Sequence, residues 1–194
     1  MLGVVLCGGK SSRMGKDKGL LASDNETWAG KLMEKLKDLR IRIVISVNAG
    51  QLQHYNDVFP DVELIVDNDS LQLHGPMAAV MSVHETYPME DLLVVACDMP
   101  YMDAMVLNEL QIQYNKYPGS EGYVFTNKGE PEPLCAIYSA TGLSSIKFLN
   151  DQGKLIRHSM KFMLDQLSIV KIPISENWGI YFRNINTHAD LNGQ

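Results

Sequence analysis

The sequence has few cysteines, no long apolar run and no excess of positive charge. Its three cysteines, Cys7, Cys97 and Cys135, are too few and too widely spaced for a disulfide framework or for a zinc site built from close pairs. The apolar stretch at the amino end stops at a pair of glycines, so it is too short for a signal peptide or a membrane span. We therefore expect a cytoplasmic protein with no membrane partner.

The charge balance argues against another class of proteins. The chain carries 17 lysines and arginines against 23 acidic residues, a net charge of −6. A protein that binds nucleic acid usually presents a basic face, so we expect no nucleic-acid partner. A small anionic ligand held by a few local donors remains compatible with this charge. With 194 residues, of which 45% are hydrophobic, the chain has the composition of one globular domain over residues 1–194.

Short apolar runs alternate with segments of helical spacing along most of the chain. The runs at 3–6, 42–47, 63–66 and 91–96 predict buried parallel strands. Helices are predicted around 28–39, 76–84, 103–114, 143–149 and 155–164, with Pro76 suited to a first turn. The runs at 122–126 and 134–137 predict a strand pair, and 169–172 a last strand. This order indicates an α/β fold with a mostly parallel sheet and a mixed edge.

The segment that follows the first predicted strand combines glycines with cations, in the order CGGKSSRMGKDK. Glycines allow backbone N–H groups to close around phosphate oxygens, and cations balance the charge of a triphosphate. The segment has neither the Walker A order nor the glycine pattern of a dinucleotide fold. Taken alone, it predicts either a phosphate-binding loop or a solvated glycine-rich turn.

Polar residues also follow the other predicted strands. Asn48 follows the second, Asp67 the third and Asp98 the fourth. The ends of parallel strands face one crevice, so these side chains should gather beside the glycine-rich segment. Asp98 is a natural ligand for Mg²⁺, which binds one or two carboxylates together with substrate phosphates. Asp67 could instead form a turn within DNDS, whereas Asp103 suits the N-cap of the next helix better than Asp98 does.

These residues, in this order, resemble the molybdenum cofactor guanylyltransferases. The matching motifs are LCGGKSSRMGKDKGLL, VNAG, LIVDND, HGPMAAVMSV, ACDMPYM, EPLCAIY and RNINTHADL. The resemblance covers nearly the whole chain and implies a three-layer, Rossmann-like nucleotidyltransferase fold. It implies Mg²⁺ as cofactor and GTP and molybdenum-loaded molybdopterin as substrates. It also implies contacts with proteins that deliver molybdopterin or mature molybdoenzymes.

The resemblance assigns nucleotide contacts to residues of the glycine-rich segment, namely Leu6, Cys7, Gly8, Gly9, Arg13 and Lys18. The first three would act through their backbone, Gly9 would shape the loop, and Arg13 and Lys18 would hold phosphates. With Asp98, which would coordinate Mg²⁺, Arg13 and Lys18 are the expected catalytic residues.

Other positions carry the rest of the expected site. The resemblance implies that Asn48 and Asp67 contact the nucleoside and that Gly75 and Pro76 approach the base or ribose. Asn184 and Asn186 match an asparagine pair associated with the acceptor side.

The sequence departs from the family at three places. Cys7 replaces an alanine, Ala79 replaces a glycine near the expected base, and His188 with Ala189 replaces a proline and a glutamate. The thiols of Cys7 and Cys97 both follow strands and are interpreted as buried and unreactive.

Three alternatives remain open: a molybdopterin cytidylyltransferase, a sugar-phosphate nucleotidyltransferase, and a nucleotide-binding regulator without catalysis. The CGG opening and Asp17 before Lys18 favour the guanylyl branch.

Overall fold

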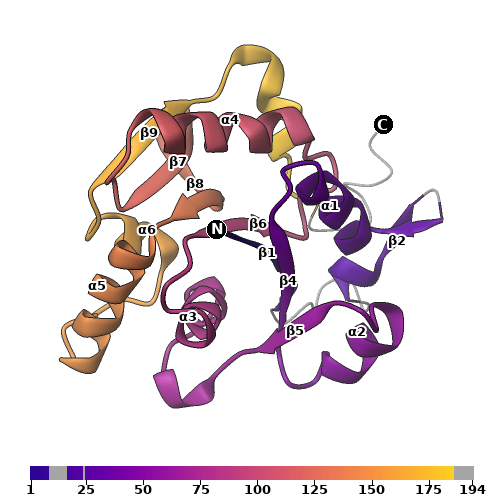
Figure 1. Ribbon diagram of the computed structural model, residues 1–194, viewed down its shortest axis with the longest axis horizontal. Helices are drawn as coiled ribbons and strands as arrows, with labels where there is room; N and C mark the ends of the chain where they lie inside the picture. The colour runs from indigo at the N-terminus through magenta and orange to yellow at the C-terminus, as the bar shows by residue number, and fades with distance from the viewer. Residues whose placement is uncertain (9–16, 24, 186–194) are drawn as a thin grey trace.

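The apolar runs of the sequence form a seven-stranded sheet at the centre of the molecule (Figure 1). The computed structural model describes residues 1–8, 17–23 and 25–185. The strand order is β5-β4-β1-β6-β8-β7-β9, and β8 runs antiparallel to both of its neighbours while the other pairs are parallel. The strands are β1 (Leu2–Leu6), β4 (Arg42–Val47), β5 (Glu63–Val66), β6 (Leu92–Ala96), β7 (Gly122–Asn127), β8 (Glu130–Tyr138) and β9 (Ile169–Pro173).

Helices cover both faces of this sheet. They are α1 (Trp28–Lys37), α2 (Leu52–Val58), α3 (Pro76–Thr86), α4 (Ala104–Lys116), α5 (Ala140–Asp151) and α6 (Met160–Leu164). Three 3₁₀ helices, η1 (Lys18–Leu20), η2 (Asp69–Leu71) and η3 (Glu176–Phe182), and a small hairpin of β2 (Ala22–Ser23) and β3 (Glu26–Thr27) complete the described part. None of the helices in that part is long and apolar enough to cross a membrane.

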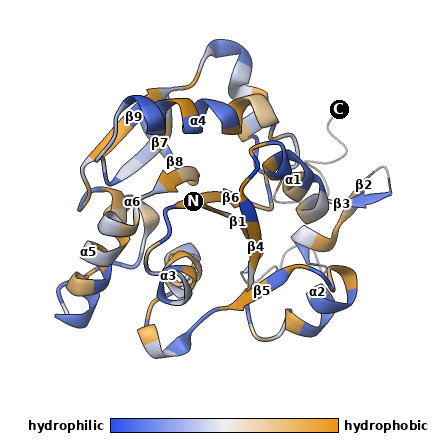
Figure 2. Cartoon of the chain, viewed as in Figure 1, coloured by the Kyte–Doolittle hydropathy of each residue, from blue (hydrophilic) through white to orange (hydrophobic). Residues whose placement is uncertain are grey.

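Two separate cores hold the three layers together. Side chains of α3, α5 and α6 pack on one face of the sheet, and those of α1 and α4 pack on the other, together with Tyr55 of α2. Alternation along β1 places Val4 in the first core and Val5 in the second. Figure 2 shows the central strands in the orange of apolar residues, whereas the helices mix apolar and polar positions. The α/β architecture with a mixed edge is therefore confirmed.

Local signals in the sequence explain where several helices begin. The side chain of Thr27 accepts a hydrogen bond from Gly30 N at 3.1 Å and caps α1. Asp103 accepts one from Met105 N at 2.8 Å, which confirms it as the cap of α4. Pro76 occupies the first turn of α3, as its fixed φ and missing N–H favour.

The structure corrects two details of the predicted elements. The helix expected at 155–164 is shorter. The side chain of Ser159 accepts a hydrogen bond from Phe162 N and caps the helix, so α6 begins only at Met160. The link between β7 and β8 is a tight turn in which Lys128 and Gly129 both have positive φ. That geometry suits a two-residue hairpin, so the residues from Glu130 onward belong to β8.

Candidate functional site

A cavity of about 180 Å³ lies beyond the carboxyl ends of β1 and β6. This is the end of a parallel sheet at which ligands of open α/β folds bind. Its walls come from the ends of both strands, from η1, from the first turns of α3 and from β8. They comprise Leu6, Cys7, Gly8, Asp17, Lys18, Pro76, Ala79, Ala96, Cys97, Asp98 and Leu134.

Lys18 and Asp98 form the charged pair of this cavity. Lys18 Nζ lies 3.5 Å from Asp98 Oδ2, and both side chains are largely buried. Burial raises the pKa of Asp98, while the charge and hydrogen bond of Lys18 oppose that rise. Burial prevails because removing a carboxylate from water is costly unless it is fully paired.

The second oxygen of Asp98 is the feature that best fits a cation. Asp98 Oδ1 is buried and has no hydrogen-bond partner among residues 1–8, 17–23 and 25–185. Within those residues no group of three or more His, Cys, Asp or Glu side chains could hold a metal ion by itself. Mg²⁺ needs only one or two carboxylates when substrate phosphates and water supply its other ligands. Asp98 therefore fits that role.

A buried polar network anchors the short segment that carries Lys18. Asp17 caps η1 by accepting a hydrogen bond from Gly19 N at 3.1 Å, and Tyr55 Oη donates to Asp17 Oδ1 at 2.8 Å. Gln51 Nε2 donates to the other oxygen of Asp17 and, at 2.9 Å, to the Cys7 carbonyl. The residue before Lys18 is thus held by Tyr55 of α2 and by Gln51, the residue that precedes this helix.

Sequence reasoning missed Gln51 and Tyr55 because it did not predict α2. The available signal was weak: Tyr55 and Phe59 are spaced by four residues in a polar segment, and their rings lie 6.0 Å apart.

Asp67 lies against Gly8 on the β4 side of the cavity. A Cβ added to Gly8 would lie 3.3 Å from Asp67 Oδ2, so the glycine leaves room for this carboxylate. Ser46 Oγ donates to Asp67 Oδ1 at 3.5 Å, but burial dominates and raises the pKa of Asp67.

Asn48 and Gln51 hold each other by two hydrogen bonds. Asn48 N donates to Gln51 Oε1 at 2.9 Å, and Gln51 N donates to Asn48 Oδ1 at 3.2 Å.

The backbone of the first strand's end offers acceptors more than donors. The amides of Cys7 and Gly8 both donate to the Ser46 carbonyl, at 2.9 and 3.1 Å. Leu6 and Cys7 carbonyls each accept one hydrogen bond, from Cys97 N and Gln51 Nε2. Because each carbonyl has two lone pairs, they can still accept from a ligand.

The carboxyl end of the described chain also reaches this site. Ile185 N donates to the Asp98 carbonyl at 3.0 Å, which brings the exposed Asn184 beside the candidate metal ligand.

Gly75 precedes Pro76 and has a φ of +63°, a conformation that favours glycine. The space around Gly75 is open. Of the other expected residues, Gly9, Arg13 and Asn186 lie outside the described residues.

The sequence profile of the MobA-like NTP transferase domain matches residues 3–168 of the chain. The chain belongs to this family. It is therefore a nucleotidyltransferase, and the resemblance noted in its motifs is confirmed.

Individual proteins agree with this assignment. A probable molybdenum cofactor guanylyltransferase from Clostridium perfringens is 30% identical over 190 residues, which cover 94% of this chain and 90% of the relative. A molybdenum cofactor biosynthesis bifunctional protein from Synechocystis is 28% identical over 143 residues, 74% of this chain but only 40% of the relative. The crystal structure of molybdopterin-guanine dinucleotide biosynthesis protein A from Archaeoglobus fulgidus shares the fold, with a TM-score of 0.79 at 23% identity and coverage of 100% and 96%.

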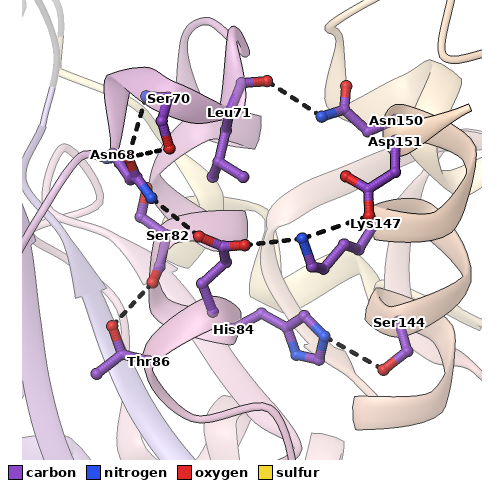
Figure 3. Close-up of polar contacts among 11 residues, drawn as sticks. Asn68, Ser70, Leu71, Ser82, His84, Thr86, Ser144, Lys147, Asn150 and Asp151 are labelled. Atoms are coloured by element: carbon purple, nitrogen blue, oxygen red, sulfur yellow. Dashed lines mark hydrogen bonds and ion pairs between the residues drawn. The ribbon is translucent and has the colours of Figure 1, made fainter. Parts of the chain in front are cut away.

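In this nucleotidyltransferase a group of polar contacts, here called the polar clamp, holds α3 against α5 (Figure 3). The first turn of α3 lines the cavity. Glu85 Oε1 pairs with Lys147 Nζ of α5 at 2.8 Å, and Asn68 Nδ2 donates to Glu85 Oε2 at 2.9 Å. Asn150 Nδ2 donates to the Leu71 carbonyl at 3.1 Å. The clamp ties α3 and α5 to the segment directly after Asp67.

His84, the residue before Glu85, lies next to the clamp and faces Ser144 of α5 (Figure 3). Its Nε2 is 3.3 Å from Ser144 Oγ, and its buried Nδ1 has no partner among the described residues. Burial first, and then the charge of Lys147, lowers the pKa of His84, while Glu85 opposes this. A folded-state pKa below the unfolded one makes the unfolded chain bind more protons over that interval. The contribution of neutral His84 to stability is thus complete above about pH 6.5, the ordinary pKa of histidine. This contribution is lost as the pH falls below that value.

We expect the melting temperature of wild-type protein to fall more steeply below that pH than the melting temperature of His84→Gln. Differential scanning calorimetry of both proteins across the interval measures the difference. His54→Gln, at an exposed position of α2, is the matched control and should follow wild type. Because the raised pKa values of Asp67 and Asp98 act in the opposite direction, only the difference between variants isolates His84. Parallel curves for wild type and His84→Gln would contradict the assignment.

Proposed function

We propose that this nucleotidyltransferase transfers GMP from GTP to molybdenum-loaded molybdopterin, with molybdopterin guanine dinucleotide and pyrophosphate as products. The observation that carries the proposal is the Lys18–Asp98 pair in the cavity at the strand ends. It occurs in a chain 30% identical to a probable molybdenum cofactor guanylyltransferase over most of both lengths. We further propose that residues 1–194 act as one nucleotidyltransferase domain.

The proposed step is an in-line displacement at phosphorus. A terminal phosphate oxygen of the acceptor attacks the α-phosphorus of GTP and forms the new phosphorus–oxygen bond. The bond from that phosphorus to the bridging oxygen of pyrophosphate breaks, and pyrophosphate leaves with the electron pair. This step needs no protein nucleophile, so the protein contributes positioning and charge neutralisation.

Each residue of the site then has a defined task. Lys18, anchored by Asp17, would neutralise phosphate charge together with Arg13. Asp98 would hold Mg²⁺, which supplies further neutralisation of the triphosphate when bound. Asn48 and Asp67 would contact the nucleoside, Gly75 and Pro76 would approach the base or ribose, and Asn184 and Asn186 would face the acceptor.

Backbone acceptors support a preference for guanine. Leu6, Cys7 and Gly8 line the cavity, and their carbonyls would accept hydrogen bonds from N–H groups of a base. Guanine carries an amino donor beside its ring N–H, whereas a base without matching donors leaves acceptors unpaired.

We expect GTP to bind at least about tenfold more tightly than CTP, UTP or ATP, since unpaired polar groups are costly. Isothermal titration of the purified protein with each triphosphate and Mg²⁺ measures the four affinities. Equal affinity for GTP and CTP would favour the cytidylyl alternative and point to Ala79 as the residue that widens the base pocket. Absence of binding to all four would overturn the proposal.

Lys18→Ala should lower kcat/KM for pyrophosphate release by about tenfold to a hundredfold, the value of one charge-assisted contact. The fold should survive, because Lys18 is not part of either apolar core. Lys37→Ala is the control, since that exposed lysine pairs with Glu34 on α1. Unchanged turnover of the Lys18 variant would remove the lysine from the phosphate site.

A further inference from the structure

Cys7 and Cys97 lie side by side at the cavity wall. Leu6 of β1 is in register with Ala96 of β6, and the residue that follows each strand is a cysteine. Cys97 N donates to the Leu6 carbonyl at 3.0 Å, which continues the ladder beyond the last paired residues. The sequence shows only that both cysteines follow strands, and we interpret them there as unreactive; the topology makes them neighbours.

The geometry of adjacent parallel strands suits a disulfide. Neighbouring strands are about 4.8 Å apart, and disulfides join Cα atoms about 4.4–6.8 Å apart. Both side chains point to the same face of the sheet, because both belong to the core beneath α1 and α4.

Cys7 and Cys97 also belong to the residues of the cavity wall, so a small oxidant inside the cavity would lie beside them. Cys7 is 5% exposed and Cys97 is 7% exposed, and each contributes to the cavity wall. Cys135 is fully buried in β8 and does not line it. Access therefore separates the pair from the third cysteine.

We propose that Cys7 and Cys97 are a dithiol modification site, which a peroxide converts into a reversible disulfide across β1 and β6. One sulfur attacks a peroxide oxygen, the O–O bond breaks, and water leaves with formation of a sulfenic acid. The second sulfur then attacks the sulfenic sulfur, the S–O bond breaks, and another water leaves. The two thiols lose two electrons and two protons in total, and hydrogen peroxide gains them. A thiol reductant reverses the bond.

The disulfide would change the cavity near Lys18. A Cβ on Gly19 would lie 3.0 Å from Cys7 Sγ, so this sulfur packs directly against η1. Cys97 immediately precedes Asp98, the candidate metal ligand. Drawing the two sulfurs together moves atoms on both sides of the Lys18–Asp98 pair. This expectation rests on the proposed function: in the disulfide form GTP should bind about tenfold more weakly, which corresponds to the loss of one charge-assisted contact.

Peptide mapping of the intact protein tests the bond itself. After brief treatment with hydrogen peroxide, alkylation and denaturation, the count of free thiols should fall from three to one. Digestion should yield one cross-linked peptide that contains Cys7 and Cys97, and dithiothreitol should restore all thiols. The link should persist in Cys135→Ser and be absent in Cys7→Ala. Sulfinic acid at either cysteine without a cross-link, or an unchanged thiol count, would overturn the proposal.

A second measurement separates this inference from the proposed function. GTP affinity is compared before and after oxidation in wild type and in Cys7→Ala, with each protein as its own reference. A loss confined to wild type supports the coupling between disulfide and nucleotide site. If reduced wild type binds no GTP although the cross-link forms, the proposed function fails and the dithiol site stands. If GTP binds but no cross-link forms, the dithiol proposal alone fails.

Discussion

Asp98→Asn should lower kcat/KM for nucleotidyl transfer by about 10²–10³-fold, a loss of several kcal/mol of charge stabilisation. Asparagine keeps the shape of the side chain but has no charge, and a neutral amide is a poor ligand for Mg²⁺. Its pairing with Lys18 is lost at the same time. Pyrophosphate release at several Mg²⁺ concentrations measures the effect. Near-normal transfer at ordinary Mg²⁺ would move the metal away from Asp98 and towards Asp67.

The same variant should be more stable than wild type in the absence of ligand. Burial raises the pKa of Asp98, so the folded protein holds this carboxylate at a cost near neutral pH. A neutral amide removes that cost, and we expect a gain on the order of 1 kcal/mol, within the range of stabilising single substitutions. Urea unfolding measures it, with Asp61→Asn in the exposed turn between α2 and β5 as control. A destabilised Asp98→Asn would show that the ion pair outweighs burial.

Gly19→Ala should be the most disruptive single-methyl change at the site. Its Cβ would lie 2.1 Å from Tyr55 Oη and 3.0 Å from Cys7 Sγ, closer to the hydroxyl than non-bonded atoms can be. Either η1 or Tyr55 must move, and both routes break the hydrogen bond from Tyr55 to Asp17. We expect destabilisation of about 3 kcal/mol, at the upper end for overpacking, and a large loss of activity as Lys18 shifts.

Tyr55→Phe offers a rescue that a nonspecific defect would not show. It deletes the clashing oxygen, and the nearest atoms that remain are Cys7 Sγ at 3.0 Å and Tyr55 Cζ at 3.2 Å from the added Cβ. The double variant should therefore recover part of the stability that Gly19→Ala loses, as a double-mutant cycle by urea unfolding would measure. Gly179→Ala in η3, with no atom within 4 Å of its Cβ, is the control. Additive effects of the two changes would show that the hydroxyl does not limit this position.

Much of the fold and part of the site could be predicted because their signals are local. The run LLVVA of β6 is buried along its whole length, and its apolar character marks it in the sequence. Asp98 comes two residues after the end of that run, so the rule that ligands bind beyond strand ends predicts its position at the cavity wall. The same rule placed Lys18 and Gly8 in one cavity.

The remainder depends on contacts between distant residues. Tyr55 and Asp17 are 38 positions apart, and no local pattern marks their hydrogen bond. The helix that carries Tyr55 has seven residues and exposes Leu52 and Val58, so its apolar periodicity is poor. The neighbouring thiols of Cys7 and Cys97 follow from strand order, which a list of strands alone does not give.

The place of β1 in the strand order governs how this chain folds. It is synthesised before the other strands, yet its two neighbours in the sheet are β4 and β6, and β6 ends at Ala96. Until that residue has left the ribosome, one edge of the LGVVL strand has no partner, and an apolar edge of this kind is prone to aggregation. Pairing across so long a stretch of chain is slow. A nascent chain that ends before β6 therefore has neither the β1–β6 strand pair nor the cavity at the end of this pair.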